Sequence, residues 1–323
     1  MAGARVLLLS DPAMAGHRPP GHPERPERVE AVASGITDAA ASAGASLDRP
    51  PVQPADAVDL ERIHPAPYLA LLDAAASHGG GWIDADTHIG PDSMVAARLA
   101  AGATIEASVA VAAGEAEVTF AVVRPPGHHA RRERAAGFCL LNNVAVAAMA
   151  LRGAGLAQRI AILDWDVHHG DGTQAIFDAD PDLCYASTHQ MPLYPGTGDA
   201  ADRGAGPGLG SKHNAPLPPG SGDAAFTDAW MTRLLPAVEA FGPEAILISA
   251  GYDAHRLDPL AELEVTEAGY RSVAAAIGRI ARAGGLQGVS LTLEGGYDLG
   301  ALRASAAATV AGLLAGLSGS EAG

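Results

Sequence analysis

The chain has 323 residues, of which 48% are hydrophobic, 4% are aromatic and 18% are charged. Its formal net charge of -16 at pH 7 disfavours nucleic acid as a partner, because the phosphate backbone is itself negative, and favours neutral or cationic ligands. Two cysteines, Cys139 and Cys184, are too few for a disulfide framework or a four-cysteine metal site, so free thiols in a reducing compartment are expected.

The sequence predicts neither a secretory signal nor a membrane helix. The run RVLLLS near the N-terminus is too short for the apolar region of a signal peptide and predicts a first strand instead. No uninterrupted apolar run approaches the roughly 20 residues that a membrane helix needs. We therefore expect a cytoplasmic protein that does not bind membranes.

Short apolar runs rich in Val, Ile and Leu alternate with helical stretches, as in sheets whose strands are buried on both faces. The predicted strands are 4–10, 118–123, 159–164, 183–187, 244–249 and 289–294. The predicted helices are 91–114, 142–153, 223–241, 266–283 and 299–317. This alternation predicts an α/β fold around a mostly parallel central sheet, in a single domain over residues 1–323.

The segment 196–222 is rich in proline and glycine and is the best candidate for a linker. Its neighbours continue the same alternation of strands and helices, so it does not divide the chain. Its GAGPGLG lacks the spacing of a dinucleotide-binding loop and does not open a helix after a strand. We therefore predict a flexible surface loop.

Polar motifs follow five of the predicted strands. RPPGHH follows 118–123, DVHHGD follows 159–164, STHQ follows 183–187, AGYDAH follows 244–249 and GGYD follows 289–294. Ligands of an open parallel sheet bind at the carboxyl ends of its strands, so these segments are expected to converge on one site.

Three of these residues form a candidate metal site. Asp166 and His168 are two residues apart, so on an extended segment they point the same way. Asp253 follows another strand and offers a third ligand. Two carboxylates and one imidazole leave a coordination position open, which is typical of catalytic zinc, although iron(II) or manganese also tolerates such ligands.

The paired histidines His128 and His129 offer a base beside such an ion, provided that a carboxylate holds the second ring nitrogen. Asp164 and Asp171 are the candidate carboxylates. Tyr297 follows two glycines and offers a hydroxyl donor to a developing oxyanion. Each residue taken alone is compatible with a purely structural role, and only the five converging segments favour catalysis.

The motifs PPGHHA, GFC, DWDVHHGDG, YPGTG, AGYDAHRLDPL and LEGGYD, together with GHPERPERV, occur in the order and approximate spacing of the histone deacetylase superfamily. The chain resembles this family from about residue 5 to 315, and the residues of its motifs are most similar to those of class II and bacterial deacetylase-like amidohydrolases. The resemblance implies the arginase/deacetylase fold, with three layers, α/β/α.

The resemblance implies one catalytic zinc ion held by Asp166, His168 and Asp253. His129 would be the general base and acid with Asp171 as its partner, whereas His128 would pair with Asp164. Tyr297 would polarise the acyl carbonyl. The family also binds a structural potassium ion, implying a site at Asp164, Asp166, His168, Ser187 and Thr188.

The resemblance further implies a narrow substrate tunnel. The Gly137 carbonyl would accept the substrate amide N–H, and Phe138 would face Tyr194, beside Leu193, where the family usually has Phe. Leu260 stands where polyamine-preferring relatives carry an acidic residue, which favours an acyl-lysine side chain. Arg25 would line an internal acetate channel.

The other histidines are expected to be structural. His169, His189 and His255 are predicted to pack in the motif loops or to hold other site residues in place. A second group, in turns or outside the converging segments, is predicted to be structural or solvated: His17, His22, His64, His78, His88 and His213.

The expected reaction is hydrolysis of an acetyl or other short acyl amide of a primary amine, with an acyl-lysine peptide or protein as substrate. An acetylpolyamine or another small acylated amine is the alternative. A binuclear manganese ureohydrolase is a weaker interpretation, because it needs further aspartates to bridge a second ion and because the paired histidines, GFC and the GGY tyrosine do not fit it. A catalytically idle acyl-amine sensor is also weaker, because every catalytic position is retained. A homo-oligomer is left open.

Overall fold

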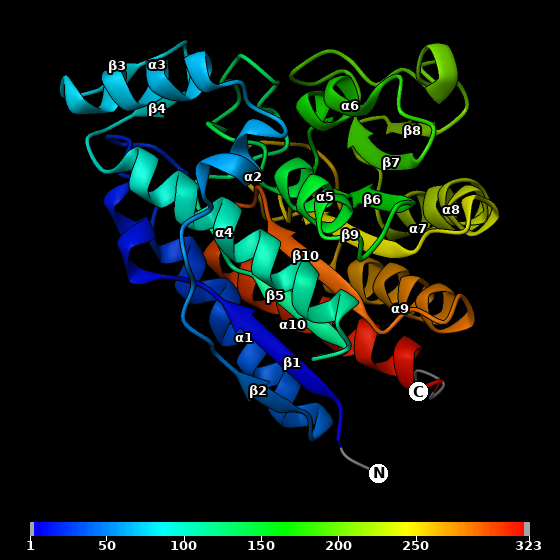
Figure 1. Cartoon of the computed structure of the whole chain (residues 1–323). Coiled ribbons are helices and arrows are strands. Elements are labelled where there is room, and N and C mark those ends of the chain that lie inside the picture. Colours follow the sequence, from blue (N-terminus) through cyan, green and yellow to red (C-terminus); the bar gives the residue numbers. More distant parts are fainter. Residues whose placement is uncertain (1–2, 320–323) are drawn as a thin grey trace.

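A central sheet of eight strands draws on nearly the whole chain in this computed structural model, which describes residues 3–319 (Figure 1). The strands are β1 (Arg5–Leu9), β2 (Ser46–Asp48), β5 (Val118–Ala121), β6 (Ile160–Asp164), β7 (Leu183–Gln190), β8 (Lys212–Leu217), β9 (Ala245–Ala250) and β10 (Val289–Leu293). Their order is β2-β1-β5-β10-β9-β6-β7-β8, and all neighbours are parallel. The six predicted strands are present, and the predicted parallel α/β sheet is confirmed.

Helices cover both faces of the sheet (Figure 1). One face carries α1 (Glu27–Ala43), α7 (Asp223–Asp228), the π-helix η3 (Ala229–Leu234), α8 (Leu235–Phe241), α9 (Glu267–Ala283) and α10 (Leu299–Ser318). The other face carries α3 (Ala66–Ser77), α4 (Ser93–Ala112) and α5 (Asn143–Gly153). Shorter elements are η1 (Pro12–Gly16), α2 (Ala57–Glu61), α6 (Asp171–Phe177), η2 (Gly206–Gly208) and the small antiparallel pair β3 (Gly81–Trp82) and β4 (His88–Ile89).

The strands alternate their side chains between these two helical layers. In β6, Ala161 and Leu163 pack into the core cluster beneath α1, α9 and α10. Ile160 and Ile162 belong instead to the cluster beneath α3 and α5. Both faces are apolar because a strand directs successive side chains to opposite sides. The three-layer α/β/α architecture is thus confirmed.

The helix α1 was not among the predicted helices, although it covers a whole edge of the sheet. Its buried apolar residues do recur at helical spacing, at Val32, Ile36 and Ala40, so the sequence carried a signal for this helix. Gly35 allows α1 to approach α10 closely, because a Cβ at this position would lie 2.0 Å from the carbonyl oxygen of Arg303.

The predicted flexible loop 196–222 is wrong in part, since it contains β8, which pairs with β7 from Tyr185 to Gln190. The stretch KHNAPL has no apolar run and includes Pro216, so its sequence does not indicate a strand. The structure tolerates these residues because β8 lies at the edge of the sheet, where one side needs no hydrogen-bonding partner strand.

Two helices, α4 and α10, have the length and composition of membrane-spanning helices, which corrects the expectation that no segment approaches this pattern. Their many alanines raise the mean hydropathy, although Arg98 and Glu106 interrupt α4 and Arg303 interrupts α10. Both helices pack on the sheet, with Ala100 and Ala103 of α4 and Leu302 and Val310 of α10 buried. Core helices of globular proteins pass the same test.

Candidate active site

Segments that follow four adjacent strands of the sheet meet at its carboxyl edge. These strands are β5, β10, β9 and β6, and the residues that follow them include His128, Tyr297, Asp253 and Asp166. The strand β7 extends to Gln190, so STHQ lies within the strand and its contribution comes from Tyr194 in the next loop. The expected convergence is therefore present, with this change.

The predicted metal ligands lie together. His168 Nδ1 is 3.1 Å from Asp166 Oδ1 and 3.2 Å from Asp253 Oδ2, and one ligand atom from each residue falls within 4.8 Å of the others. Within the described chain, Asp253 Oδ2 is buried and accepts no hydrogen bond. A buried acceptor without a donor, directed at a second carboxylate and an imidazole, fits a divalent cation.

A glycine gives these carboxylates room. A Cβ on Gly295 would lie 2.1 Å from Asp253 Oδ2 and 2.6 Å from Asp166 Oδ2. The N–H of Gly295 also donates to Asp166 Oδ2 at 2.8 Å. The turn after β10 therefore holds one ligand in place and makes space for the other.

The charges of this cluster call for a cation. Burial raises the pKa of Asp253, and the adjacent Asp166 carboxylate raises it further. Although burial opposes it, the neighbouring carboxylates of Asp166 and Asp253 raise the pKa of His168 to about 10. Two carboxylates thus keep a positive charge between them, and a divalent ion would supply that charge more effectively.

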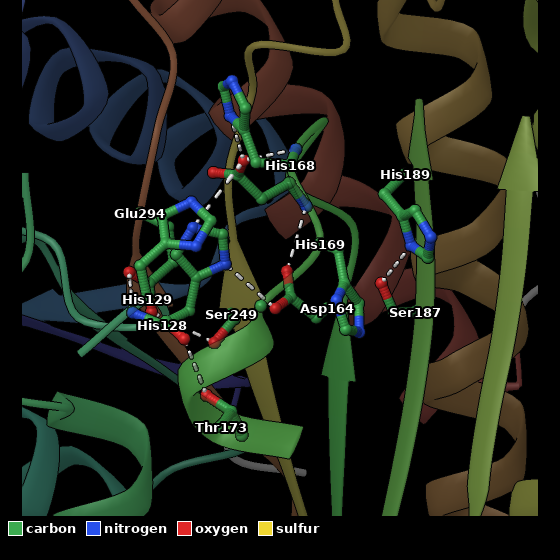
Figure 2. Close-up of polar contacts among 12 residues, drawn as sticks. His128, His129, Asp164, His168, His169, Thr173, Ser187, His189, Ser249 and Glu294 are labelled. Carbon is green, nitrogen blue, oxygen red and sulfur yellow. Dashed lines mark hydrogen bonds and ion pairs between the residues drawn. The ribbon is translucent and has the colours of Figure 1, made fainter. Parts of the chain in front are cut away.

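Each of the paired histidines is held by its own carboxylate, in the pairing that the resemblance implied. His128 Nδ1 lies 3.1 Å from Asp164 Oδ2, and His129 Nδ1 lies 2.9 Å from Asp171 Oδ1. Figure 2 shows both rings beside Asp164 and His168. The Nδ1 contacts leave the two Nε2 atoms available to a ligand in the pocket.

The two histidines differ in charge. Burial and the neighbouring His128 lower the pKa of His129 to about 3, so its ring is neutral at pH 7. Although burial opposes it, the carboxylates of Asp166 and Asp164 raise the pKa of His128 well above its usual range. Environment therefore separates a neutral ring, suited to accept a proton, from a charged one.

A narrow pocket of about 120 Å³ opens onto these groups. Gly137, Phe138 and Tyr194 line it, as predicted, and so do Tyr297 and Gly295. Burial raises the pKa of Tyr297 well above its usual range, so the phenol remains a hydrogen-bond donor. Gly137 has φ 54° and Phe138 has φ 68°, a left-handed pair that turns the Phe138 ring into the pocket.

Two predicted substrate-binding residues are not in this lining. Leu193 packs against the main core cluster, because the loop turns the neighbouring Tyr194 toward His129 instead. Leu260 is only half-buried, and its N–H donates to Asp258 Oδ1 at 3.0 Å. Both assignments are corrected: neither side chain lines the pocket, which includes Asp86 instead.

The channel arginine is also corrected. Arg25 precedes α1 and is exposed, whereas Arg28 lies in the first turn of α1 and is completely buried. Arg28 donates from Nε and Nη2 to the carbonyl oxygens of Gly296 and Glu294, and its guanidinium lies 5.0 Å from the centroid of the Tyr297 ring. The helical turn directs Arg28, and not Arg25, toward the site.

Sequence reasoning missed two buried carboxylates that shape the site. Glu294 Oε2 accepts the N–H groups of Gly127 and His128 at 2.6 and 3.1 Å, which fixes the turn carrying the histidines. Burial raises the pKa of Glu294 to about 7. Asp258 Oδ2 accepts the N–H of Tyr297 at 2.7 Å. The sequence signal that could have identified both residues is their position inside the motifs LEGGYD and AGYDAHRLDPL.

A third missed residue, Arg131, lies behind Asp171. Its Nε and Nη2 donate to Asp171 Oδ2 at 3.0 and 2.8 Å, while the other oxygen faces His129. Although burial opposes it, hydrogen bonds from His129 and Arg131 lower the pKa of Asp171 to about 2. Asp171 is therefore a fixed anion.

The remaining histidines lie outside the pocket lining. His169 bonds Thr197 and Gln174, and His189 bonds Ser187 and the carbonyl of Gly198. Other predicted structural histidines are buried, as with His17 and His64, or exposed, as with His78. His22 packs edge-on against Phe138, with 4.3 Å between ring centroids.

The residues of the predicted potassium site lie near one another. Asp164 and Ser187 are register partners between β6 and β7. Ser187 Oγ is 3.0 Å from His189 Nδ1, and Thr188 Oγ1 accepts a hydrogen bond from Trp230 Nε1. A potassium ion at this position stays a prediction.

Comparison with known proteins identifies similar sequences that are named as deacetylases or related amidohydrolases. The chain is 39% identical to the histone deacetylase-like amidohydrolase of Pseudomonas aeruginosa over 303 residues, 92% of this chain and 78% of that protein. It is 41% identical to a probable deacetylase of Archaeoglobus fulgidus over 296 residues, 91% of this chain and 81% of that protein.

Two solved structures are similar over nearly the whole chain. The HD domain of HDA15 superposes with a TM-score of 0.89 at 36% identity, covering 96% of this chain and 88% of that one. The acetylpolyamine aminohydrolase from Burkholderia pseudomallei superposes with a TM-score of 0.84 at 30% sequence identity, covering 95% of this chain and 98% of that one. The sequence model of the histone deacetylase domain matches residues 22–313, a range that contains every catalytic and metal-site residue described above, and the chain therefore belongs to the histone deacetylase family.

Proposed function

We propose that this chain is a zinc-dependent amidohydrolase that removes an acetyl or other short acyl group from an acylated amine. The observation that carries the proposal is the arrangement around one pocket. Asp166, His168 and Asp253 form a three-ligand group beside two carboxylate-held histidines, and Tyr297 lines the same cavity. Base, ligands and hydroxyl donor are the groups that metal-assisted amide hydrolysis requires.

Asp166, His168 and Asp253 would hold the ion. When bound, zinc supplies a Lewis acid that polarises the acyl carbonyl and makes water more acidic. The mixed oxygen and nitrogen ligands also tolerate iron(II), so the native metal is part of the experiment below. A potassium ion near Asp164 and Ser187 would steady the loop after β6, which carries Asp166 and His168, and would take no part in the chemistry.

The proton transfers are assigned to His129. Its neutral ring would accept a proton from the attacking water through Nε2, while Asp171 holds Nδ1 and stabilises the imidazolium that forms. The same ring would then deliver this proton to the leaving amine, so that a carboxylic acid and a free amine result. His128, charged beside Asp164, would stabilise negative charge in the transition state.

The pocket walls would select and orient the substrate. The Tyr297 hydroxyl would donate a hydrogen bond to the acyl oxygen as charge develops there. Phe138 and Tyr194 bound a narrow entrance suited to an unbranched alkyl chain. The Gly137 carbonyl would accept the amide N–H; in this structure it accepts a hydrogen bond from Cys139 Sγ.

We propose an acyl-lysine side chain as the principal substrate, with a small acylated amine as the second candidate. The second candidate gains support from Asp86, a carboxylate in the pocket lining that suits a distal cation, and from the likeness to an acetylpolyamine aminohydrolase. Leu260 does not favour one substrate class over the other, because it does not line the pocket. The reducing cytoplasm is the proposed location, in keeping with two buried free thiols.

A binuclear ureohydrolase is less favoured. It needs further carboxylates to bridge a second ion, and among the described residues only one group of three or more metal-binding side chains is present. An idle sensor would bind an acylated amine without releasing acid.

The decisive experiment joins metal analysis to turnover. The purified protein is assayed for bound metal and for acetate release from an acetyl-lysine peptide, acetylputrescine and longer acetylpolyamines. We expect about one zinc or iron per chain and acetate release from at least one substrate. Binding without release supports the sensor, and two manganese ions with urea release from a guanidino substrate supports the ureohydrolase.

A further inference from the structure

Lysine is used once in this chain. Of the 21 lysine and arginine residues, 20 are arginine and one is Lys212. Lys212 is completely buried in β8, although lysine is among the residues least often found fully buried. A chain that uses arginine for every other basic side chain thus retains lysine at one internal position.

The buried ammonium is surrounded by neutral oxygens. Lys212 Nζ lies 2.8 Å from the carbonyl oxygen of Leu183, 3.1 Å from that of Asp180 and 2.6 Å from Ser211 Oγ. An ammonium has three N–H donors, so these three acceptors satisfy it completely. The other large buried cations, Arg28 and Arg124, form ion pairs with Glu24.

No carboxylate pairs with Lys212 among residues 3–319. The Asp180 carboxylate binds Arg152, so it is the backbone oxygen of Asp180 that faces the ammonium. Burial lowers the pKa of Lys212 to about 8, with Cys184, Asp180 and Asp178 partly opposing the shift. The charged form therefore predominates at pH 7.

This oxygen cage, formed by Asp180 O, Leu183 O and Ser211 Oγ, joins two segments of the fold. One is the turn between α6 and β7, and the other is the end of loop 191–211, which also carries Tyr194 of the pocket. Ser211 Oγ lies 2.7 Å from the carbonyl oxygen of Gly208 and 3.2 Å from that of Asp180, and the N–H of Ala205 donates to the Asp178 carbonyl at 2.9 Å. Without a cation, the three oxygens of the cage would converge with no ammonium N–H donor between them.

We propose that the Lys212 ammonium is a resident cation, permanently filling an oxygen cage that would otherwise bind a dissolved monovalent ion of the K⁺ or NH₄⁺ type, and thereby anchoring loop 191–211. Carbonyl oxygens replace the hydration shell of such ions in proteins. Lysine is a compact point charge on a flexible stem, whereas the planar fork of arginine does not fit three oxygens converging on one atom. This explains why the single lysine occurs here.

The cage is separate from the predicted potassium site. That site involves Ser187 and Thr188, whereas the cage uses Leu183 at the opposite end of β7. The response of the wild-type protein to potassium therefore serves as the baseline for measurements on the cage.

Three variants test the proposal by thermal unfolding in choline chloride, KCl and NH₄Cl at about 0.15 M, a concentration that keeps screening constant. Lys212→Ala opens the cage, Lys212→Met fills it without charge, and His213→Ala is the control on the same strand. We expect Lys212→Ala to lose at least about 4 °C of Tm in choline chloride and to regain at least about half of it in KCl or NH₄Cl. Lys212→Met should lose stability in all three salts.

The proposal is overturned if Lys212→Ala responds to K⁺ and NH₄⁺ no more than wild type and His213→Ala do, or if Lys212→Met keeps the wild-type Tm. Folding of Lys212→Ala only in KCl or NH₄Cl supports it. If Lys212→Ala folds in no salt, the Lys212→Met comparison decides. Acylation of wild type with an amine-reactive ester should modify Lys212 only after unfolding, and equally fast modification of the native protein also overturns the proposal.

Discussion

The catalytic role proposed for Tyr297 can be tested by a single substitution. Its hydroxyl lines the pocket, and within the described chain its backbone, not its phenol, makes the positioning hydrogen bond. We expect Tyr297→Phe and His129→Ala each to lower kcat by at least roughly 100-fold, because one removes an oxyanion donor and the other the base. Steady-state acetate release measures the effect, and circular dichroism checks the fold. Near-wild-type turnover in either variant contradicts the assigned role.

Arg131 is expected to act on the base through Asp171. Arg131→Gln should lower kcat by about 10-fold with little change in KM, because it frees the carboxylate that orients His129 without touching the pocket. Arg131→Lys should restore part of the loss. Arg134→Gln is the matched control, because Arg134 lies five residues after His129 on the same hairpin and is exposed. An equal loss in both glutamine variants would point to the hairpin and not to the contact with Asp171.

At the scale of elements, the turn after β10 shows how a loop builds a metal site. Gly295→Ala should weaken metal binding by at least about 10-fold, since its Cβ would overlap the oxygens of Asp166 and Asp253. Metal content after dialysis against a competing chelator measures this. Gly300→Ala in α10 is the control, because its Cβ would meet only Asp298 Oδ1, at 3.3 Å. Equal metal retention in both variants would contradict the steric argument.

The elements also differ in how well their sequences predict them. The central strand β6 begins with the continuous apolar run IAIL, because both of its faces are covered by helices. The edge strand β8 has no such run, since its Lys212, Asn214 and Pro216 are accommodated by contacts outside the sheet or by an unpaired edge. Local pattern therefore predicts the centre of the sheet better than its edge.

For the whole molecule, acid stability should depend on His64, which joins the turn before α3 to α5 and to the 131–134 hairpin. The N–H of Asn142 donates to His64 Nε2 at 2.9 Å, so Nδ1 carries the hydrogen and donates to the carbonyl of Arg132. Burial lowers the pKa of His64 to about 4, because a protonated ring would place a second hydrogen against the Asn142 N–H.

The sign follows from proton linkage. The unfolded chain binds a proton at His64 below pH 6.5 but the folded chain only below about 4, so the free energy of unfolding falls as pH drops through this window. For His64 alone the loss between pH 7 and pH 4 is about 3 kcal/mol. Urea unfolding of His64→Gln, with chelator present, should show a fall smaller by up to that amount. The exposed His78→Gln is the control, and an unchanged pH dependence in His64→Gln contradicts the prediction.

The sequence by itself determined the parallel α/β fold, the family and the principal chemistry of this protein. Apolar runs marked the buried strands, and the polar residues directly after them had to meet, because parallel strands end at one edge of the sheet. The resemblance to the family then implied that His128 pairs with Asp164 and His129 with Asp171, and the structure brings both pairs together.

Only the tertiary structure decided which further side chains reach the site. Arg28, not Arg25, meets the turn at Gly296, 268 residues away in the chain, because the rotation of α1 selects it. Neither Leu193 nor Leu260 lines the pocket, while Glu294 and Asp258 hold its backbone. The Lys212 cage likewise combines oxygens from separate turns. Local sequence patterns do not encode such contacts, because they depend on how complete elements pack against one another.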